Sequence, residues 1–292
     1  MSVKDKLNYL FDFLNNEKQQ TFLKRLNNFL AVLCIFFILN NFDQLNVVDI
    51  SLLDFGILEI ILTLGFYLNY GILWSRFMKL NYNGSFRDYF FNWSYSKMGK
   101  YIPSGLMTLS VRLNQNLNKK QNQKILFFGL LEEQFLIPFI AIPPLILTLL
   151  LNNQSLKPLY FFVSICIMFI FVKILYTKIK VSYFSLLKFN ISFLIHYLLI
   201  ILLFNEIAKN LNHPDPFSVS ISYFLATCIG MFFIGVPAGI GIREFIFLGY
   251  VNNFLSDTAV FPIIIKIRII FLFFDIVFGF LGLLYSNFLK KN

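Results

Sequence analysis

The sequence predicts an all-α polytopic integral membrane protein with about eight membrane segments, including two that are broken by Pro and Gly or are re-entrant. Two observations predict this class. The chain is 58% hydrophobic and only 14% charged, whereas soluble domains are closer to half apolar and a quarter charged. Several apolar runs also approach or exceed the roughly 20 residues that a helix needs to cross the hydrocarbon core. A soluble domain of this length could not bury so much apolar surface.

Residues 1–25 precede the apolar runs and are expected to form a cytoplasmic tail. They are polar and Lys-rich, with no short apolar core ahead of a small-residue cleavage site, so we expect no cleavable signal. Leu7, Leu10, Phe11 and Leu14 fall on one helical face. This pattern fits a short amphipathic helix on the membrane surface, and it fits a solvated tail equally well.

Residues 26–289 are predicted to form one membrane domain, with an internal repeat of two halves, 26–151 and 158–289, as one interpretation. The seventh segment is short for a full span, so a half-helix or a re-entrant hairpin is the alternative there. The eight apolar segments lie at roughly 26–46, 53–75, 125–151, 158–177, 186–208, 217–236, 241–256 and 259–288.

The positions of the charged residues orient these segments. Cytoplasmic loops hold most Lys and Arg of a membrane protein, and most of the 25 cations here fall on one side if the N-terminus is cytoplasmic. The exceptions are Lys157, Lys209, Lys266 and Arg268. All charged residues of the loop 40–54 are acidic, which is compatible with a loop on the outer side of the membrane. Both termini are therefore expected in the cytoplasm. The net charge of +10 follows from this asymmetry and from attraction to anionic lipid heads, and it gives no ground for nucleic-acid binding.

Two similar turns interrupt the apolar sequence. Ile102-Pro103-Ser104-Gly105-Leu106 and Val236-Pro237-Ala238-Gly239-Ile240 both have the order aliphatic, Pro, small, Gly, aliphatic, and an arginine follows each, Arg112 or Arg243. Paired Gly/Pro-interrupted segments in the two halves of a chain indicate a transporter binding site. The similarity of the two turns is explained either by a true internal repeat or by coincidence over five residues.

Each turn has the chemistry of an anion site. Pro103 and Pro237 cannot continue the preceding helix. Gly105, Gly239 and Gly241 let a backbone or a ligand approach closely. The helix that follows starts with free N–H groups and the positive end of its dipole, which suit an anion.

Arg243 and Glu244 follow the second turn directly. Arg243, one turn into the next helix, can bind a phosphate through two hydrogen bonds. The alternative is an interfacial arginine that snorkels beside a capping glutamate. The Gly239-x-Gly241 spacing lacks the third Gly of a dinucleotide fingerprint and the Gly-Lys-Ser/Thr of a Walker loop, so we expect no nucleotide site.

Charged side chains also fall inside the predicted spans, where a charge is costly unless it is paired or faces a cavity. Glu132 and Glu133 lie in the third span, and Arg112 is a candidate ion-pair partner for them. Lys266 and Arg268 open the last span, and Asp275 follows two turns later on the same face as Arg268. Asp275 is too deep to reach the interface, so we expect a cation beside it.

His196 is central in the fifth span, and Glu59 and Glu206 also lie within spans. A lone intramembrane His can serve proton relay or acyl transfer, but no catalytic partner is evident, so a hydrogen-bonded packing role is favoured. The sequence has no metalloprotease, serine-hydrolase, metal-cluster or P-loop motif, and we expect neither enzyme activity nor a cofactor or metal. The cysteines are interpreted as small buried hydrophobes: Cys34, Cys166 and Cys228.

The two turns resemble the signatures of a known family. Gly99-Lys100-Tyr101-Ile102-Pro103, followed by Arg112, looks like the first signature of the flippase-like membrane proteins related to the membrane domain of lysylphosphatidylglycerol synthases. Pro237-Ala238-Gly239-Ile240-Gly241-Ile242-Arg243-Glu244 resembles the second signature, and Arg268 falls where the family tends to carry an arginine. The resemblance covers roughly residues 20–288.

The resemblance implies a lipid translocase in the bacterial inner (plasma) membrane, without the aminoacyl-transferase domain of the synthases. Two departures concern the turns: Ala238 replaces the usual Gly, and Ser104-Gly105 replaces Gly-Lys, which removes a cation from the first site. The residues expected to line the headgroup site or cavity are Pro103, Gly105, Arg112, Glu133, Pro237, Gly239, Gly241, Arg243, Glu244 and Arg268.

Three functions stay open at this point. The first is a translocase that moves a phospholipid or a polyprenyl-linked lipid between leaflets. The second is an integral-membrane transferase that acts on a lipid-linked substrate through His196 or the acids Asp43, Asp49 and Asp54. The third is an accessory subunit of an envelope glycolipid or glycosyltransferase system. Membrane lipids are the expected substrate, and envelope-lipid or glycosyltransferase enzymes are the expected protein partners.

Overall fold

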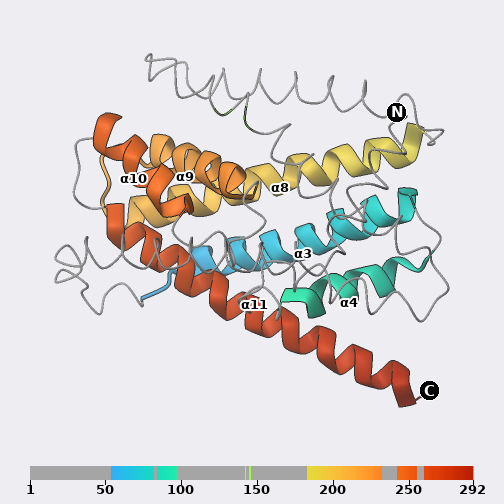
Figure 1. Ribbon diagram of the computed structural model, residues 1–292. Helices are drawn as coiled ribbons and strands as arrows, with labels where there is room; N and C mark the ends of the chain where they lie inside the picture. Colours follow the sequence, from blue (N-terminus) through green and yellow to red (C-terminus); the bar gives the residue numbers. More distant parts are fainter. Residues whose placement is uncertain are drawn as a thin grey trace, which may run out of the picture.

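The computed structural model describes residues 54–81, 84–97, 142, 145, 183–231, 242–254 and 260–291. All regular structure within these residues is helical (Figure 1). The helices are α3 (Ile57–Asn81), α4 (Phe86–Ser96), α8 (Tyr183–Asn210), α9 (Pro216–Met231), α10 (Ile242–Phe254) and α11 (Val260–Lys291).

Three of these helices are long and apolar enough to cross a membrane. Their candidate spans are Ile57–Lys79 in α3, Ile191–Asn210 in α8 and Pro262–Asn287 in α11. A rise of 1.5 Å per residue makes even the 20-residue span about 30 Å long, which matches a hydrocarbon core. The prediction of a helical, membrane-embedded protein is therefore confirmed at this level, and these spans coincide with the second, fifth and eighth predicted segments.

The other predicted segments are seen in part or not at all. The first, third and fourth fall almost entirely outside the described residues, as does the N-terminal tail. The sixth and seventh correspond to α9 and α10, whose 16 and 13 residues are each shorter than a full span. The connection 232–241 between them also lies outside the described residues. The number of segments and the internal repeat thus stay predictions, as does the choice between a span and a re-entrant hairpin.

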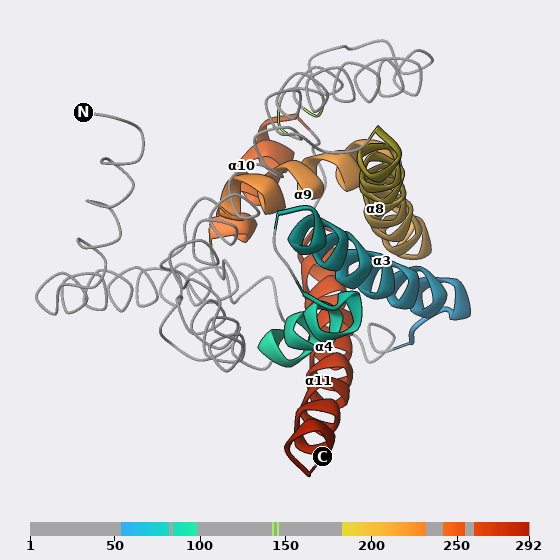
Figure 2. The same cartoon turned by 90° about the vertical axis from the view of Figure 1, so that its right-hand side faces the viewer.

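The helices pack in a continuous series. Figure 2 shows the order α10, α9, α8, α3 and α4, and each helix packs against the next. Helix α11 crosses this series and contacts α4, α3, α8 and α10. Helices α3 and α8 run in opposite directions, as the crossing hydrogen bonds show. Asn69 donates to the Ser192 carbonyl at 2.8 Å, and Arg76 donates to the Lys188 carbonyl at 2.8 Å.

A tight connection returns the chain from α8 to α9. Asn212 adopts a left-handed backbone with φ of 57°, and the N–H of His213 donates to the Ala208 carbonyl at 3.0 Å, which closes the end of α8. Asp215 then caps α9 by accepting from the N–H of Ser218 at 3.1 Å. Pro216 occupies the first helical position, where its missing N–H costs nothing.

A stripe of large apolar side chains along each long helix is exposed. On α8 these are Ile191, Ile195, Leu198 and Leu202, which recur every three or four residues and lie on one face. Similar exposed residues follow one another on α3 and α11, among them Ile61, Leu64, Phe273 and Phe280. Soluble proteins rarely show such stripes on several helices, but a surface that contacts lipid tails requires them.

Helix α4 packs on α11 through a backbone-to-backbone contact at Gly282. A Cβ at this position would lie 2.3 Å from the Tyr95 nitrogen and 2.9 Å from the Phe91 carbonyl oxygen. Three residues later, Tyr285 stacks on Phe91 with ring centroids 4.0 Å apart and donates to Asp88 at 3.0 Å. Small residues commonly allow helices to approach closely in membranes, so Gly282 sets the distance between α4 and α11.

Replacing Gly282 with Ala should destabilise the protein by about 1–3 kcal/mol, because the added Cβ meets backbone that cannot move locally. Gly249→Ala in α10 is the matched control, since nothing lies within 4 Å of its added Cβ and Ala favours a helix over Gly. Thermal unfolding in detergent would measure both. Equal unfolding midpoints for the two variants would contradict close packing at Gly282.

Candidate functional site

Helix α10 extends over Ile242–Phe254, within the predicted seventh segment, and Arg243 is its second residue rather than one turn into the helix. Arg243 and Glu244 therefore both lie in its first turn. An acidic residue there is favourable, since the helix dipole is positive at its N-terminus. An arginine at this position instead adds its own positive charge to the positive end of the dipole. The turn residues Pro237, Gly239 and Gly241 lie outside the described part of the chain.

Glu244 binds Arg268 of α11. The Arg268 Nε donates to Glu244 Oε1 at 2.8 Å, and Nη2 of the same guanidinium contacts the same oxygen. The Glu244 side chain is 8% exposed and the Arg268 side chain is 25% exposed, so this is a partly buried ion pair. Three residues that the sequence assigned to one site, Arg243, Glu244 and Arg268, thus lie on two packed helices.

Arg243 lies against a glycine of the neighbouring helix. Its side chain covers Gly230 of α9, where an added Cβ would lie 2.6 Å from Arg243 Cγ. Arg243 is only 9% exposed. A snorkelling arginine extends its charged end into water, so this burial favours the interpretation as an internal site over that of an interfacial anchor. We refer to Arg243, Glu244 and Arg268 below as the arginine cluster.

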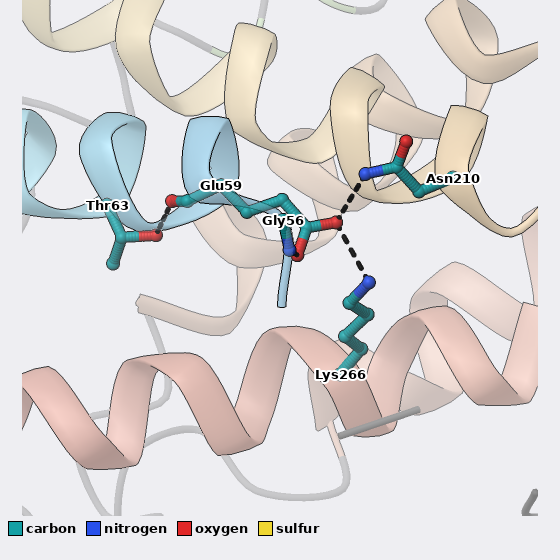
Figure 3. Close-up of polar contacts among 5 residues, drawn as sticks. All are labelled: Gly56, Glu59, Thr63, Asn210 and Lys266. Atoms are coloured by element: carbon teal, nitrogen blue, oxygen red, sulfur yellow. Dashed lines mark hydrogen bonds and ion pairs between the residues drawn. The ribbon is translucent and has the colours of Figure 1, made fainter. Parts of the chain in front are cut away.

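A second buried charge pair lies where three helices meet. Lys266 Nζ of α11 is 2.9 Å from Glu59 Oε1 of α3, with side chains that are 3% and 0% exposed (Figure 3). Asn210, the last residue of α8, donates to the same oxygen at 2.9 Å. The N–H of Gly56 donates to the other carboxylate oxygen at 3.3 Å. The carboxylate is therefore held by groups from α8, α11 and the start of α3.

This pair explains a residue that the charge rule left unexplained. Lys266 falls on the predicted outer side, where lysine is disfavoured, but its charge is neutralised inside the protein by Glu59. The predicted topology places the start of α3, the end of α8 and the start of α11 on the same side of the membrane. The structure brings these three helix ends together at Glu59, and the side of the membrane on which they lie stays a prediction.

A third polar cluster surrounds Asp275, for which the sequence predicted a cationic partner. The Tyr67 hydroxyl donates to Asp275 Oδ1 at 2.7 Å. The ammonium of Lys97 lies 5.5 Å from the centre of the Tyr67 ring, 4.6 Å from that of Tyr70 and 4.2 Å from that of Trp93. Tyr67 thus contacts both Asp275, through its hydroxyl, and Lys97, through its ring, whereas a direct contact between Asp275 and a cation stays a prediction. Lys97 lies two residues before the first signature.

His196 is packed between aromatic rings. It stacks on Phe66, with ring centroids 4.7 Å apart, and it lies 4.8 Å from Tyr70. Its Nδ1 atom has no hydrogen-bond partner among the described residues. The packing role that the sequence favoured is therefore observed, whereas the hydrogen bond expected with it is not seen at Nδ1.

The structure leaves much of the predicted site untested. Within the described residues, no group of three or more His, Cys, Asp or Glu side chains is arranged to hold a metal ion. The site residues that lie outside the described part of the chain are Pro103, Gly105, Arg112, Glu133, Pro237, Gly239 and Gly241.

Sequence reasoning missed how the charges pair. Glu59 and Lys266 were each noted as intramembrane charges, but their contact was not predicted. Two opposite charges near the predicted outer ends of two spans were the available signal. Tyr67 and Lys97 carried no such signal, because aromatic residues are abundant throughout the chain and Lys97 lies in a Lys-containing loop.

Comparison with known proteins found no match: no family model, no curated protein and no solved structure is similar to the chain. The function is therefore argued from the site and from the resemblance of the two turns.

Replacing Lys266 with Met should destabilise the protein by about 3–5 kcal/mol, because Glu59 would keep a buried charge without its cation. The exposed Lys209, next to Asn210 in α8, provides the control Lys209→Met, which should leave stability unchanged. Denaturant unfolding in bicelles would measure both.

The double variant Glu59→Gln with Lys266→Met should recover part of this loss, since it removes both charges. Additive losses in the double variant would show that the two side chains do not stabilise each other.

Proposed function

We propose that the protein is a flippase-like lipid translocase that moves a phospholipid or a polyprenyl-linked lipid between the leaflets of the membrane. The observation that carries this proposal is the arginine cluster. Arg243 and Glu244 lie at the start of α10, and Glu244 binds Arg268 of α11, a helix long and apolar enough to cross a membrane. Charges in this setting are costly, and in membrane proteins they commonly mark the path of a substrate or an ion.

The chemistry of the cluster suits a phosphate group. Arginine presents several N–H donors in a plane and binds phosphate through paired hydrogen bonds. The start of α10 adds backbone N–H groups and the positive end of the helix dipole. A lipid headgroup that enters between the helices would meet all of these groups at once, while its acyl chains stay against the apolar surfaces.

Glu244 gives the cluster a means to exchange partners. It accepts hydrogen bonds from Arg268 in the structure described here. A phosphate oxygen is an equivalent acceptor, so a headgroup competes with Glu244 for Arg268. When the headgroup leaves, the carboxylate takes its place and no guanidinium stays unpaired in the apolar interior. This exchange would let a charged headgroup enter and leave the site without being trapped there in a deep free-energy minimum.

The resemblance of both turns to the flippase-like family supports the same proposal. Arg112 and Glu133, expected near the first turn, would extend the cluster. The transferase and accessory-subunit alternatives do not explain why Arg243, Glu244 and Arg268 lie together.

Arg243→Ala should slow lipid movement about tenfold or more, because charge-assisted hydrogen bonds contribute about 1.5–3 kcal/mol each. Proteoliposomes would carry a fluorescent phospholipid or a polyprenyl-phosphate analogue, and quenching of outer-leaflet label would report transfer. Arg87→Ala is the matched control, since Arg87 is exposed and lies over the Tyr285 ring, 4.9 Å from its centre. Equal rates in wild type and Arg243→Ala would rule out this site.

Glu244→Gln should separate binding from movement. The substitution removes the carboxylate that competes for Arg268, so the affinity for a phospholipid should rise several-fold while transfer slows. Affinity is measured by the thermal shift that added lipid produces, and transfer by the proteoliposome assay. A parallel fall in affinity, transfer and stability would mean that Glu244 acts only as a structural partner.

A further inference from the structure

Tyr223, in the middle of α9, has a buried hydroxyl that no structural role explains. The side chain is 0% exposed. Its hydroxyl has no hydrogen-bond partner among the described residues. Buried tyrosine hydroxyls usually find a partner, because a buried polar group without one destabilises the folded protein. A phenylalanine would fill the same space without that cost.

Among the described residues, the Tyr223 ring contacts Phe247 of α10 and Phe204 of α8. Phe247 contacts it edge-on, with centroids 5.0 Å apart, and lies one helical turn after Arg243 and Glu244 on α10. Phe204 contacts it from α8 at 4.8 Å and also contacts Phe271 at 6.1 Å.

Phe271 in turn lies one helical turn after Arg268 on α11. Tyr223 therefore contacts Phe247 beside the cluster on α10, and it is connected to the α11 part of the cluster only through Phe204 and Phe271.

The face of α9 that carries Tyr223 also contacts the arginine cluster. On α9, Tyr223 and Gly230 are two turns apart and share a face. Gly230 is the residue that the Arg243 side chain covers, so this face of α9 forms one wall of the arginine cluster.

We propose that the Tyr223 hydroxyl is a headgroup-binding group, which donates a hydrogen bond to a phosphate oxygen held by the arginine cluster. The inference rests on the proposed function and narrows the ligand to a lipid with an anionic phosphate ester. The donor is fixed in advance by the surrounding rings, so binding orders no further side chain. A hydrogen bond to an anionic oxygen is stronger than one between neutral groups, which gives a reason for a tyrosine at this position.

The chain offers a closely matched control. Tyr197 of α8 is also buried, at 1% exposed, and its hydroxyl also has no partner among the described residues. Its ring packs against Phe193 and Phe224, and its electrostatic neighbour is the Cys228 thiol. Tyr197→Phe thus removes an equivalent hydroxyl on a different helix.

The test compares Tyr223→Phe with Tyr197→Phe in the full chain. Binding of phosphatidylethanolamine is measured by the thermal shift that it produces in detergent micelles, with dioleoylglycerol, which has no phosphate, as the comparison lipid. Movement of fluorescent phosphatidylethanolamine is followed in proteoliposomes. Tyr223→Phe should weaken binding and slow movement about tenfold, and Tyr197→Phe should change each less than twofold. Without lipid, both variants should unfold at or above the wild-type temperature, because neither loses a hydrogen bond.

The outcomes separate this inference from the function on which it rests. If Arg243→Ala stops lipid movement but Tyr223→Phe behaves like Tyr197→Phe, the translocase stands and the role of Tyr223 is overturned. A marked fall in the lipid-free unfolding temperature of Tyr223→Phe would reveal a structural partner and also overturn it. If wild type neither binds nor moves phosphatidylethanolamine or the polyprenyl-phosphate analogue, both proposals are wrong.

Discussion

The buried pair of Glu59 and Lys266 is the interaction on which the described structure depends. It joins α3 to α11, and Asn210 adds the end of α8 to the same carboxylate. A buried ion pair contributes little net stability compared with apolar residues of the same size, but an unpaired buried charge is strongly unfavourable. Any slip of one helix along another would separate the charges. The pair therefore fixes the relative register of three helices that apolar packing alone would leave free to slide.

The arginine cluster depends on that register through α11. Lys266 and Arg268 are two residues apart, so they point to different sides of the helix. Lys266 reaches Glu59 of α3, and Arg268 reaches Glu244 of α10. Holding Lys266 in place therefore also sets the depth and direction of Arg268. Tyr67, which binds Asp275 two turns farther along α11, fixes the same helix at a second point. A site that must exchange a carboxylate for a phosphate thus rests on a helix that is held by other contacts.

Part of this arrangement could be predicted from residue patterns. Apolar runs of sufficient length identified α3, α8 and α11 as spans, because the bilayer imposes a minimum length on any helix that crosses it. A helix after Pro237 and its glycines was expected, and α10 occupies Ile242–Phe254. Arg243, Glu244 and Arg268 were selected because charge is expensive in hydrocarbon. The partner of Asp275 was harder to predict, since Tyr67 belongs to another helix and is one of many aromatic residues.

The sequence by itself determined the class of protein and identified the charged residues whose position inside a membrane segment needs an explanation. Composition, segment length and the cost of buried charge are local properties, and each can be read from consecutive residues. Only the tertiary structure decided which charges meet: Lys266 with Glu59, and Arg268 with Glu244. It also showed that the Tyr223 hydroxyl is buried without a partner among the described residues, and that its ring contacts Phe247, one helical turn after Arg243 and Glu244. These pairings depend on the face that each helix presents and on the register between helices, which are set by packing between segments far apart in the chain.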